Sequence, residues 1–135
     1  MAYRMDLLSR KDRLSALEPD EVLAGMQAEA DGVYIHDAVY HYILQLVRAT
    51  REHPYLEMGA SPRATMALVK MSRAFAWLRD RDYVSPEDVG SQFGHVVMHR
   101  LQLNGKARME QVKREQIIEQ LLRSVKKPVP KGAER

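Results

Sequence analysis

The sequence predicts an all-α fold, a small bundle of five or six helices with at most very short β-bridges. Apolar residues recur at helical spacing in two long segments and in three shorter ones, whereas the β-prone runs are too short to form a sheet. With 135 residues, of which 45% are hydrophobic and 29% charged, the chain has the size and composition of one globular domain. We therefore expect one compact unit with a real core.

Two long helices are predicted where the apolar stripes are longest. Between Asp37 and Thr50 the apolar residues fall at i, i+1, i+4, i+5, i+8 and i+9: Ala38, Val39, Tyr42, Ile43, Leu46 and Val47. A second stripe continues for about four turns, through Ala64, Ala67, Leu68, Met71, Ala74, Phe75 and Leu78. These stripes should face a common interior. Met66, Val69 and Trp77 lie off the second stripe, so they either cover a second core layer or dock on another domain.

Shorter helices are predicted before and after this pair. Their ranges and apolar residues are Pro19 to Ala30 (Val22, Leu23, Met26), Ser85 to Leu101 (Val89, Phe93, Val96, Val97, Leu101) and Lys113 to Lys126 (Ile117, Ile118, Leu121, Leu122, Val125). A further helix could cover Tyr3 to Leu14. The β-prone runs Gly32–Ile35, Asp82–Val84 and Leu101–Leu103 allow one or two bridge-like strand pairs.

The domain is expected to cover residues 1–127, with a flexible tail over residues 128–135, because Pro128 and Pro130 do not fit a continuing helix. The chain contains no cysteine, which excludes disulfides and thiolate metal sites and favours a cytoplasmic location. We expect no membrane insertion, since no run approaches the ~20 apolar residues that a spanning helix needs. The C-terminal part is basic, but Glu110, Glu115 and Glu119 interleave with its Lys and Arg residues, which argues against nucleic-acid binding.

Two predicted helices begin with the same residue pair. In Ser61-Pro62-Arg63 and in Ser85-Pro86-Glu87-Asp88, the serine can cap free backbone N–H groups and the proline suits the first helical position. At the second start, two acidic residues complement the positive end of the helix dipole. We interpret this start as structural.

Arg63 makes the first start different, because a positive charge in the first turn opposes the helix dipole. A helix N-terminus together with a guanidinium suits a phosphate group, since both donate hydrogen bonds to phosphoryl oxygens. The alternative is a local ion pair between Arg63 and Glu57 or another nearby carboxylate. Spacing alone leaves both readings open.

The surrounding motifs bear on this choice. The segments Leu46–Pro54 (LVRATREHP), Gly59–Ala64 (GASPRA) and Asp82–Val89 (DYVSPEDV), followed by His99-Arg100-Leu101, occur in an order and spacing that closely resembles the C-terminal lid of the MoxR family of AAA+ ATPases. The resemblance covers most of the chain, from residue 14 to residue 125. These three motifs together are specific.

This resemblance implies a helical lid domain with the sensor 2 motif at residues 59–64. Arg63 then matches the sensor 2 arginine, which approaches the ATP γ-phosphate, while Ser61 and Pro62 shape the turn beside the nucleotide. It further implies ATP with Mg²⁺ as the cofactor, the AAA+ core of the same parent chain and neighbouring subunits of a hexameric ring as partners, chaperone-like remodelling, and partners with von Willebrand factor A domains.

The catalytic parts of such an ATPase are absent from this sequence. No G-x-x-x-x-G-K-[ST] phosphate loop occurs, since Gly105-Lys106 is followed by Ala107, and no apolar strand ends in paired acids for Mg²⁺. We therefore expect a part of a longer ATPase that is inactive alone. Two alternatives remain: a stand-alone helical adaptor module that binds no nucleotide, and a small domain that binds nucleic acid through residues 104–135.

Two further pairs of residues are weaker candidates. His95 and His99 have a spacing that could hold a metal, but they lack the glutamate of H-E-x-x-H, so we expect no metal site. Arg48 and Arg51 could contact the nucleotide of a neighbouring subunit or pair with Glu52 and other surface acids. We favour the structural reading, because most exposed charges are solvated or weakly paired.

Overall fold

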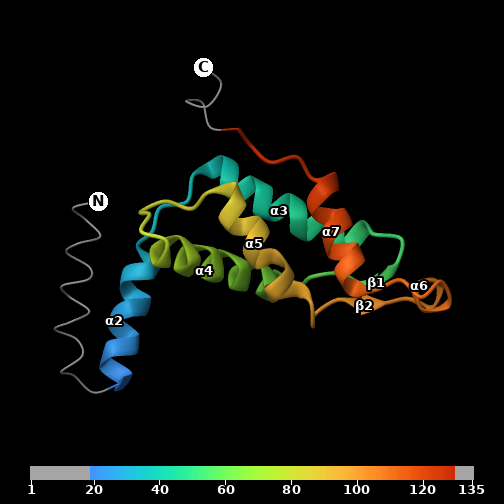
Figure 1. The fold of residues 1–135 in the computed structure, drawn as a ribbon, viewed down its shortest axis with the longest axis horizontal. Coiled ribbons are helices and arrows are strands. Elements are labelled where there is room, and N and C mark those ends of the chain that lie inside the picture. Colours follow the sequence, from blue (N-terminus) through green and yellow to red (C-terminus); the bar gives the residue numbers. More distant parts are fainter. Residues whose placement is uncertain (1–18, 130–135) are drawn as a thin grey trace.

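The computed structural model describes residues 19–129, apart from the side chains of residues 19, 20 and 22. Figure 1 shows the elements in chain order: α2 (Pro19–Asp31), α3 (Asp37–Glu52), β1 (Leu56–Met58), α4 (Pro62–Leu78), α5 (Pro86–Val97), β2 (Gln102–Leu103), α6 (Gly105–Met109) and α7 (Arg114–Ser124). The predicted all-α class and the five predicted main helices are confirmed. The helix predicted over Tyr3 to Leu14 lies outside the described residues, and so does most of the predicted tail.

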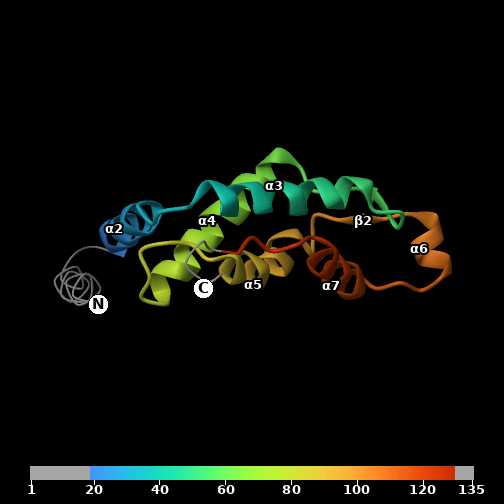
Figure 2. The same cartoon turned by 90° about the horizontal axis from the view of Figure 1, so that it is seen from above.

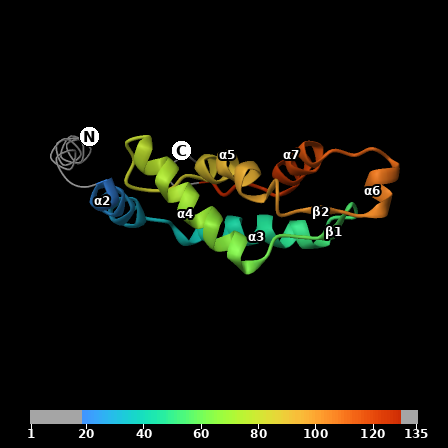
Figure 3. The ribbon, with the colours of Figure 1, turned by 90° about the horizontal axis from the view of Figure 1, so that it is seen from below.

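The helices form an elongated bundle. Helix α4 packs most extensively on α5 and also contacts α2 and α3, whereas α7 contacts α3 and α5. In Figure 2 and Figure 3, α3 lies on one side of the molecule, α5 and α7 lie on the other, and α4 crosses between these two layers. Helix α2 occupies one end, and β1, β2 and α6 occupy the opposite end.

Helices α3, α5 and α7 bury the apolar faces that their sequences predict. Within α3, Ala38 is exposed, but the other five stripe residues are buried, and Ile43 and Leu46 are fully so. Every residue predicted for the apolar face of the helix over Ser85 to Leu101, which is α5, is buried: Val89, Phe93, Val96, Val97 and Leu101. These three helices therefore contribute their predicted faces to the core.

Helix α4 buries a different face from the predicted one over its C-terminal half. Met71 and Leu78 were expected inside, yet they are 44% and 61% exposed. The buried residues there are Val69, Ser72, Ala76 and Trp77. The prediction was wrong because α4 is covered by α2, α3 and α5 at different points along its length, so its buried side turns around the helix. Val69 and Trp77 are thus part of the core, while Met66 is 66% exposed.

Two helix predictions need smaller corrections. Helix α5 ends at Val97 rather than Leu101, because the chain must become extended for β2 to pair antiparallel with β1. Both Arg100 and Leu101 donate their backbone N–H to the Val97 carbonyl in the turn that follows. On α2, Leu23 was predicted to face the core but is 57% exposed. This helix lies at the end of the bundle and contacts mainly α4.

The short extended segments pair in two places. Tyr34 and Tyr83, from two of the predicted β-prone runs, form a parallel bridge, in which the Tyr34 N–H donates to the Asp82 carbonyl and the Val84 N–H donates to the Tyr34 carbonyl. The partner of Gln102–Leu103 is Leu56–Met58, which was not predicted. Helix α6 was also missed, although Asn104 caps it by accepting a hydrogen bond from the Ala107 N–H at 2.9 Å. None of the helices within residues 19–129 is long and apolar enough to cross a membrane.

Candidate functional site

Helix α4 begins as its sequence predicts. Ser61 has an extended backbone, and its Oγ accepts a hydrogen bond from the Ala64 N–H at 3.3 Å. Pro62 occupies the first helical turn, where its missing N–H leaves no unpaired donor. The cap and the proline set where the helix starts, and Arg63 follows immediately in the first turn. The start of α4 is therefore defined by local chemistry.

Hydrogen bonds from the last turn of α3 hold the turn that precedes α4. The Ala60 N–H donates to Thr50 Oγ1 at 2.8 Å, and Arg51 Nε donates to the Ala60 carbonyl at 3.0 Å. At Gly59 an added Cβ would lie 2.6 Å from the backbone nitrogen of Arg51. Glycine is thus required by a close approach of two backbones. These contacts fix the direction from which the chain enters α4.

Arg63 projects from this start without a partner among the described residues. Its side chain is exposed, and neither an ion pair nor a hydrogen bond joins it to any residue within 19–129. The alternative of an ion pair with Glu57 is wrong in this structure. The first turn of α4 also contains no acidic residue. A cation therefore stands at the positive end of a helix dipole, and no acidic residue in the described part of the chain pairs with it.

The chemistry available at this point is that of an anion-binding surface. A guanidinium offers a planar set of N–H donors, and a helix N-terminus adds a positive partial charge. Both favour a phosphate or carboxylate oxygen supplied from outside the described chain. No acceptor group of the protein competes for Arg63 within residues 19–129.

In contrast, the polar groups at the start of α5 find their partners within or next to that start. Ser85 and Asp88 form a capping box, in which Asp88 Oδ2 accepts from the Ser85 N–H at 2.8 Å and Ser85 Oγ accepts from the Asp88 N–H at 3.2 Å. The other Asp88 oxygen pairs with the Arg81 guanidinium. Asp88 is 1% exposed, so this start is part of the core. The prediction of a structural role is confirmed.

The two arginines on α3 have separate partners. Arg48 pairs with Glu52 through Nε at 3.2 Å, which agrees with the favoured structural reading. Arg51 forms no ion pair among the described residues and instead donates to the backbone of Ala60. The predicted pairing of Arg51 with a surface acid is therefore wrong. A carbonyl of the turn replaces the acid, because the turn lies directly against the end of α3.

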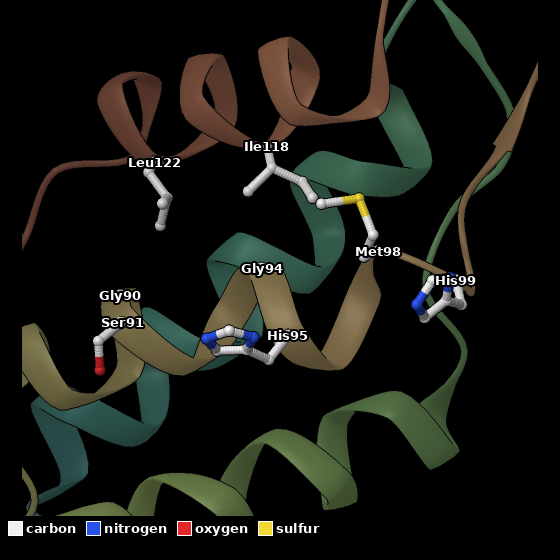
Figure 4. Close-up of a pocket in the computed structure, with 8 residues that line it drawn as sticks. All are labelled: Gly90, Ser91, Gly94, His95, Met98, His99, Ile118 and Leu122. Carbon is white, nitrogen blue, oxygen red and sulfur yellow. The ribbon is translucent and has the colours of Figure 1, made fainter.

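The two candidate histidines line a pocket away from this site. The pocket has a volume of 290 Å³ and lies between α5 and α7, with His95 and His99 along one rim and Ile118 and Leu122 on the other (Figure 4). Within residues 19–129, no three His, Cys, Asp or Glu residues gather closely enough to hold a metal ion. Met98 joins Ile118 and Leu122 in the lining, so the pocket is largely apolar apart from Ser91 and the two histidines.

Two of the described tyrosines have a raised pKa, and neither belongs to the start of α4. Burial raises the pKa of Tyr42, with a further contribution from the negative charge of Glu87. A hydrogen bond with Glu110 raises the pKa of Tyr55, followed by a smaller effect of desolvation. Both rings stay neutral at physiological pH and carry no charge toward Arg63.

Thr50 is the site residue that the sequence reasoning missed. It sits on the buried side of α3, three residues after Val47, and is fully buried. A polar residue on an otherwise apolar stripe signals that a specific buried hydrogen bond is needed. That signal was present in the sequence, but the partner, Ala60, is visible only in the structure.

Comparison with known proteins shows the family to which the chain belongs. The model of the AAA lid domain matches residues 48–121, which include the end of α3, the turn, α4, α5 and most of α7. The chain belongs to this family. The lid domain is 34% identical to the chaperone MoxR1 of Mycobacterium tuberculosis over 115 residues, or 78% of the chain and 30% of MoxR1. The MoxR protein of Methylorubrum extorquens is 40% identical over 72 residues. The lid is thus of the MoxR type of AAA+ ATPases.

Longer alignments extend this likeness to nearly the whole chain. An uncharacterized protein, YeaC of Bacillus subtilis, is 34% identical over 137 residues, covering 97% of the lid domain and 43% of YeaC. A solved structure of a candidate ATPase from Cytophaga hutchinsonii has a TM-score of 0.75 and 35% identity over 82% of the lid domain. The chain spans less than half the length of each of these proteins.

Proposed function

We propose that this lid domain contributes Arg63 as the sensor 2 arginine of a MoxR-type AAA+ ATPase. The observation that carries the proposal is the exposed, unpartnered guanidinium in the first turn of α4, on a turn that α3 holds in place. A cation at a helix N-terminus matches the negative charge that develops on a phosphoryl group in transfer. Arg63 would donate to γ-phosphate oxygens, with Ser61 and Pro62 defining its helix start.

The residues of the lid fit a phosphate oxygen and not the metal that accompanies it. Arg63 and the helix terminus offer donors and positive charge, whereas the described residues include no cluster of carboxylates and histidines suited to Mg²⁺. We therefore assign the binding of ATP and Mg²⁺ to an AAA+ core in the same parent chain. When bound there, the ion neutralises phosphate charge, and Arg63 acts from the lid side.

Coupling follows from the rigid connection between Arg63 and the bundle. Because the turn before α4 is bonded to α3, a change in the contact of Arg63 moves α3 and α4 together relative to the core. In a ring of subunits, six being our expectation, such a movement would transmit strain to neighbours. Chaperone-like remodelling of clients, partners with von Willebrand factor A domains and a cytoplasmic location are parts of the same proposal.

Arg63→Ala in the full-length ATPase tests this function. We expect ATP turnover to fall on the order of a hundredfold, since one preorganised donor at a transferring group has an effect of that size. Lys70→Ala is the matched control, because Lys70 is an exposed cation on the same helix, about two turns beyond Arg63. Turnover that is unchanged in Arg63→Ala, or lowered equally in Lys70→Ala, would contradict the assignment.

A further inference from the structure

Both backbone groups of Ala60 are bonded to adjacent side chains at the end of α3. Thr50 Oγ1 accepts from the Ala60 N–H at 2.8 Å, and Arg51 Nε donates to the Ala60 carbonyl at 3.0 Å. Ala60 itself is 1% exposed. A single peptide segment is thus held from both sides, only three residues before Arg63. We call Thr50 and Arg51 the Ala60 clamp.

The hydroxyl of Thr50 is fixed by a second bond. Its hydrogen is donated to the Val47 carbonyl at 2.5 Å, which leaves an oxygen lone pair for the Ala60 N–H. A hydroxyl can donate and accept through one oxygen atom, and the branched threonine side chain restricts its rotation more than serine does. Thr50 is 0% exposed, so no solvent can replace it as the acceptor for Ala60.

Gly59 removes the remaining freedom of the turn. An added Cβ would lie 2.6 Å from the carbonyl carbon of Thr50 and 2.7 Å from the Cα of Arg51. Such distances are shorter than any van der Waals contact, so the backbone of the turn lies too close to α3 for any side chain at this position. It cannot move inward, and the Ala60 clamp prevents it from moving outward.

We propose that Thr50 and Arg51 are positioning residues for Arg63, which they direct through the backbone of Ala60. The inference rests on the proposed function of Arg63 and adds two residues on another helix. Ser61 caps α4 directly after the clamped residue, so the orientation of the first turn of α4 follows the orientation of Ala60. A displacement of about 1 Å at a reacting group can cost a hundredfold in rate. The clamp therefore acts on catalysis through geometry.

The test is a double-mutant cycle on ATP turnover by the full-length ATPase. Arg51→Met keeps the length of an exposed side chain and removes the donor to Ala60. Thermal unfolding of the variant checks that its fold is intact. We expect kcat to fall about tenfold or more in the wild-type background. In the Arg63→Ala background, Arg51→Met should cause no further loss, because the residue it positions is gone. Arg48→Met is the matched control, since Arg48 is bonded to Glu52 and not to the turn.

A second pair of variants separates positioning from simple loss of packing. Thr50→Val keeps the branched shape but cannot accept from Ala60, and it should lower kcat; Thr50→Ser keeps the hydroxyl and should retain most of the activity. An equal loss from Arg51→Met in both backgrounds would show that Arg51 acts independently of Arg63 and would overturn the inference. An unchanged kcat in Arg51→Met, or in Thr50→Val, in the wild-type background would also overturn it.

The failure of the proposed function itself has a separate signature. In that case Arg63→Ala alone would leave turnover unchanged, and the Ala60 clamp would have no catalytic residue to position. When Arg63→Ala slows turnover and Arg51→Met does not, the proposed function stands and only the clamp is wrong.

Discussion

Helices α4 and α5 begin with the same Ser-Pro pair but are completed in opposite ways. At α5, the capping box of Ser85 and Asp88 and the ion pair with Arg81 satisfy the start from within, and Asp88 is 1% exposed. At α4, the turn is held by residues of α3, and the charge of Arg63 is left without a partner among residues 19–129. We call the start of α5 the closed start, because Asp88 is paired, and the start of α4 the open start, because Arg63 is unpaired among the described residues.

Under our proposal, the same local signature serves stability at α5 and function at α4. Serine and proline fix where a helix begins in both cases. The next residues decide the role, because acids complement the helix dipole and an arginine opposes it. At an open start, the rigidity that α5 obtains from its own capping box is supplied by the neighbouring helix. An arginine that opposes the helix dipole next to a rigidly held turn is the observation that supports our proposal for Arg63.

Asp88→Ala tests the closed start and has the largest expected effect on stability. The substitution removes the capping bond to Ser85 and leaves the partly buried Arg81 guanidinium without its partner. Because breaking such a pair leaves an uncompensated charge, we expect the free energy of unfolding to fall by about 3 kcal/mol. Chemical denaturation of the 135-residue chain measures this change.

The neighbouring Glu87 provides the control for that measurement. It is exposed in the same first turn, so Glu87→Ala should lower the free energy of unfolding by less than about 1 kcal/mol. Similar losses for the two variants would mean that Asp88 acts only through the helix dipole. The description of the α5 start as a closed unit would then be wrong.

Arg63→Glu tests the open start, with a smaller effect of opposite sign. Replacing a cation by an anion in the first turn of α4 relieves the conflict with the helix dipole. We expect the free energy of unfolding of the 135-residue chain to rise by about 0.5 kcal/mol. Lys70→Glu, in the middle of the same helix, should change it less. A clear loss of stability in Arg63→Glu would show that Arg63 supports the fold.

The five main helices were predictable because each carries an apolar period in its own residues, whereas the short helix α6 has a cap but no such period and was missed. The exceptions depended on neighbours. Met71 and Leu78 continue the stripe of α4, but the helices that cover α4 bury Ala76 and Trp77 instead. The end of α5 at Val97 depends on the pairing of β2 with β1, which joins segments far apart in the chain.

The residues of the candidate site also fall into two groups, those that the sequence could identify and those that it could not. Arg63, Ser61 and Pro62 could be selected from the sequence, since the conflict between charge and helix dipole is local. The role of Thr50 could not, because its acceptor bond to Ala60 spans a turn whose path is set by the close approach of Gly59 to α3. Arg51 likewise has a nearby acid in sequence, Glu52, but its bond goes to the Ala60 carbonyl.

The most direct test of the open start is whether Arg63 senses the γ-phosphate. The affinities of the full-length ATPase and of its Arg63→Ala variant for ATP and for ADP can be compared by calorimetry under conditions that prevent hydrolysis. We predict that Arg63→Ala weakens ATP binding about tenfold or more, as expected for the loss of a charged hydrogen bond, and leaves ADP binding within about twofold. Equal weakening of both nucleotides, or no change in either, would contradict the account.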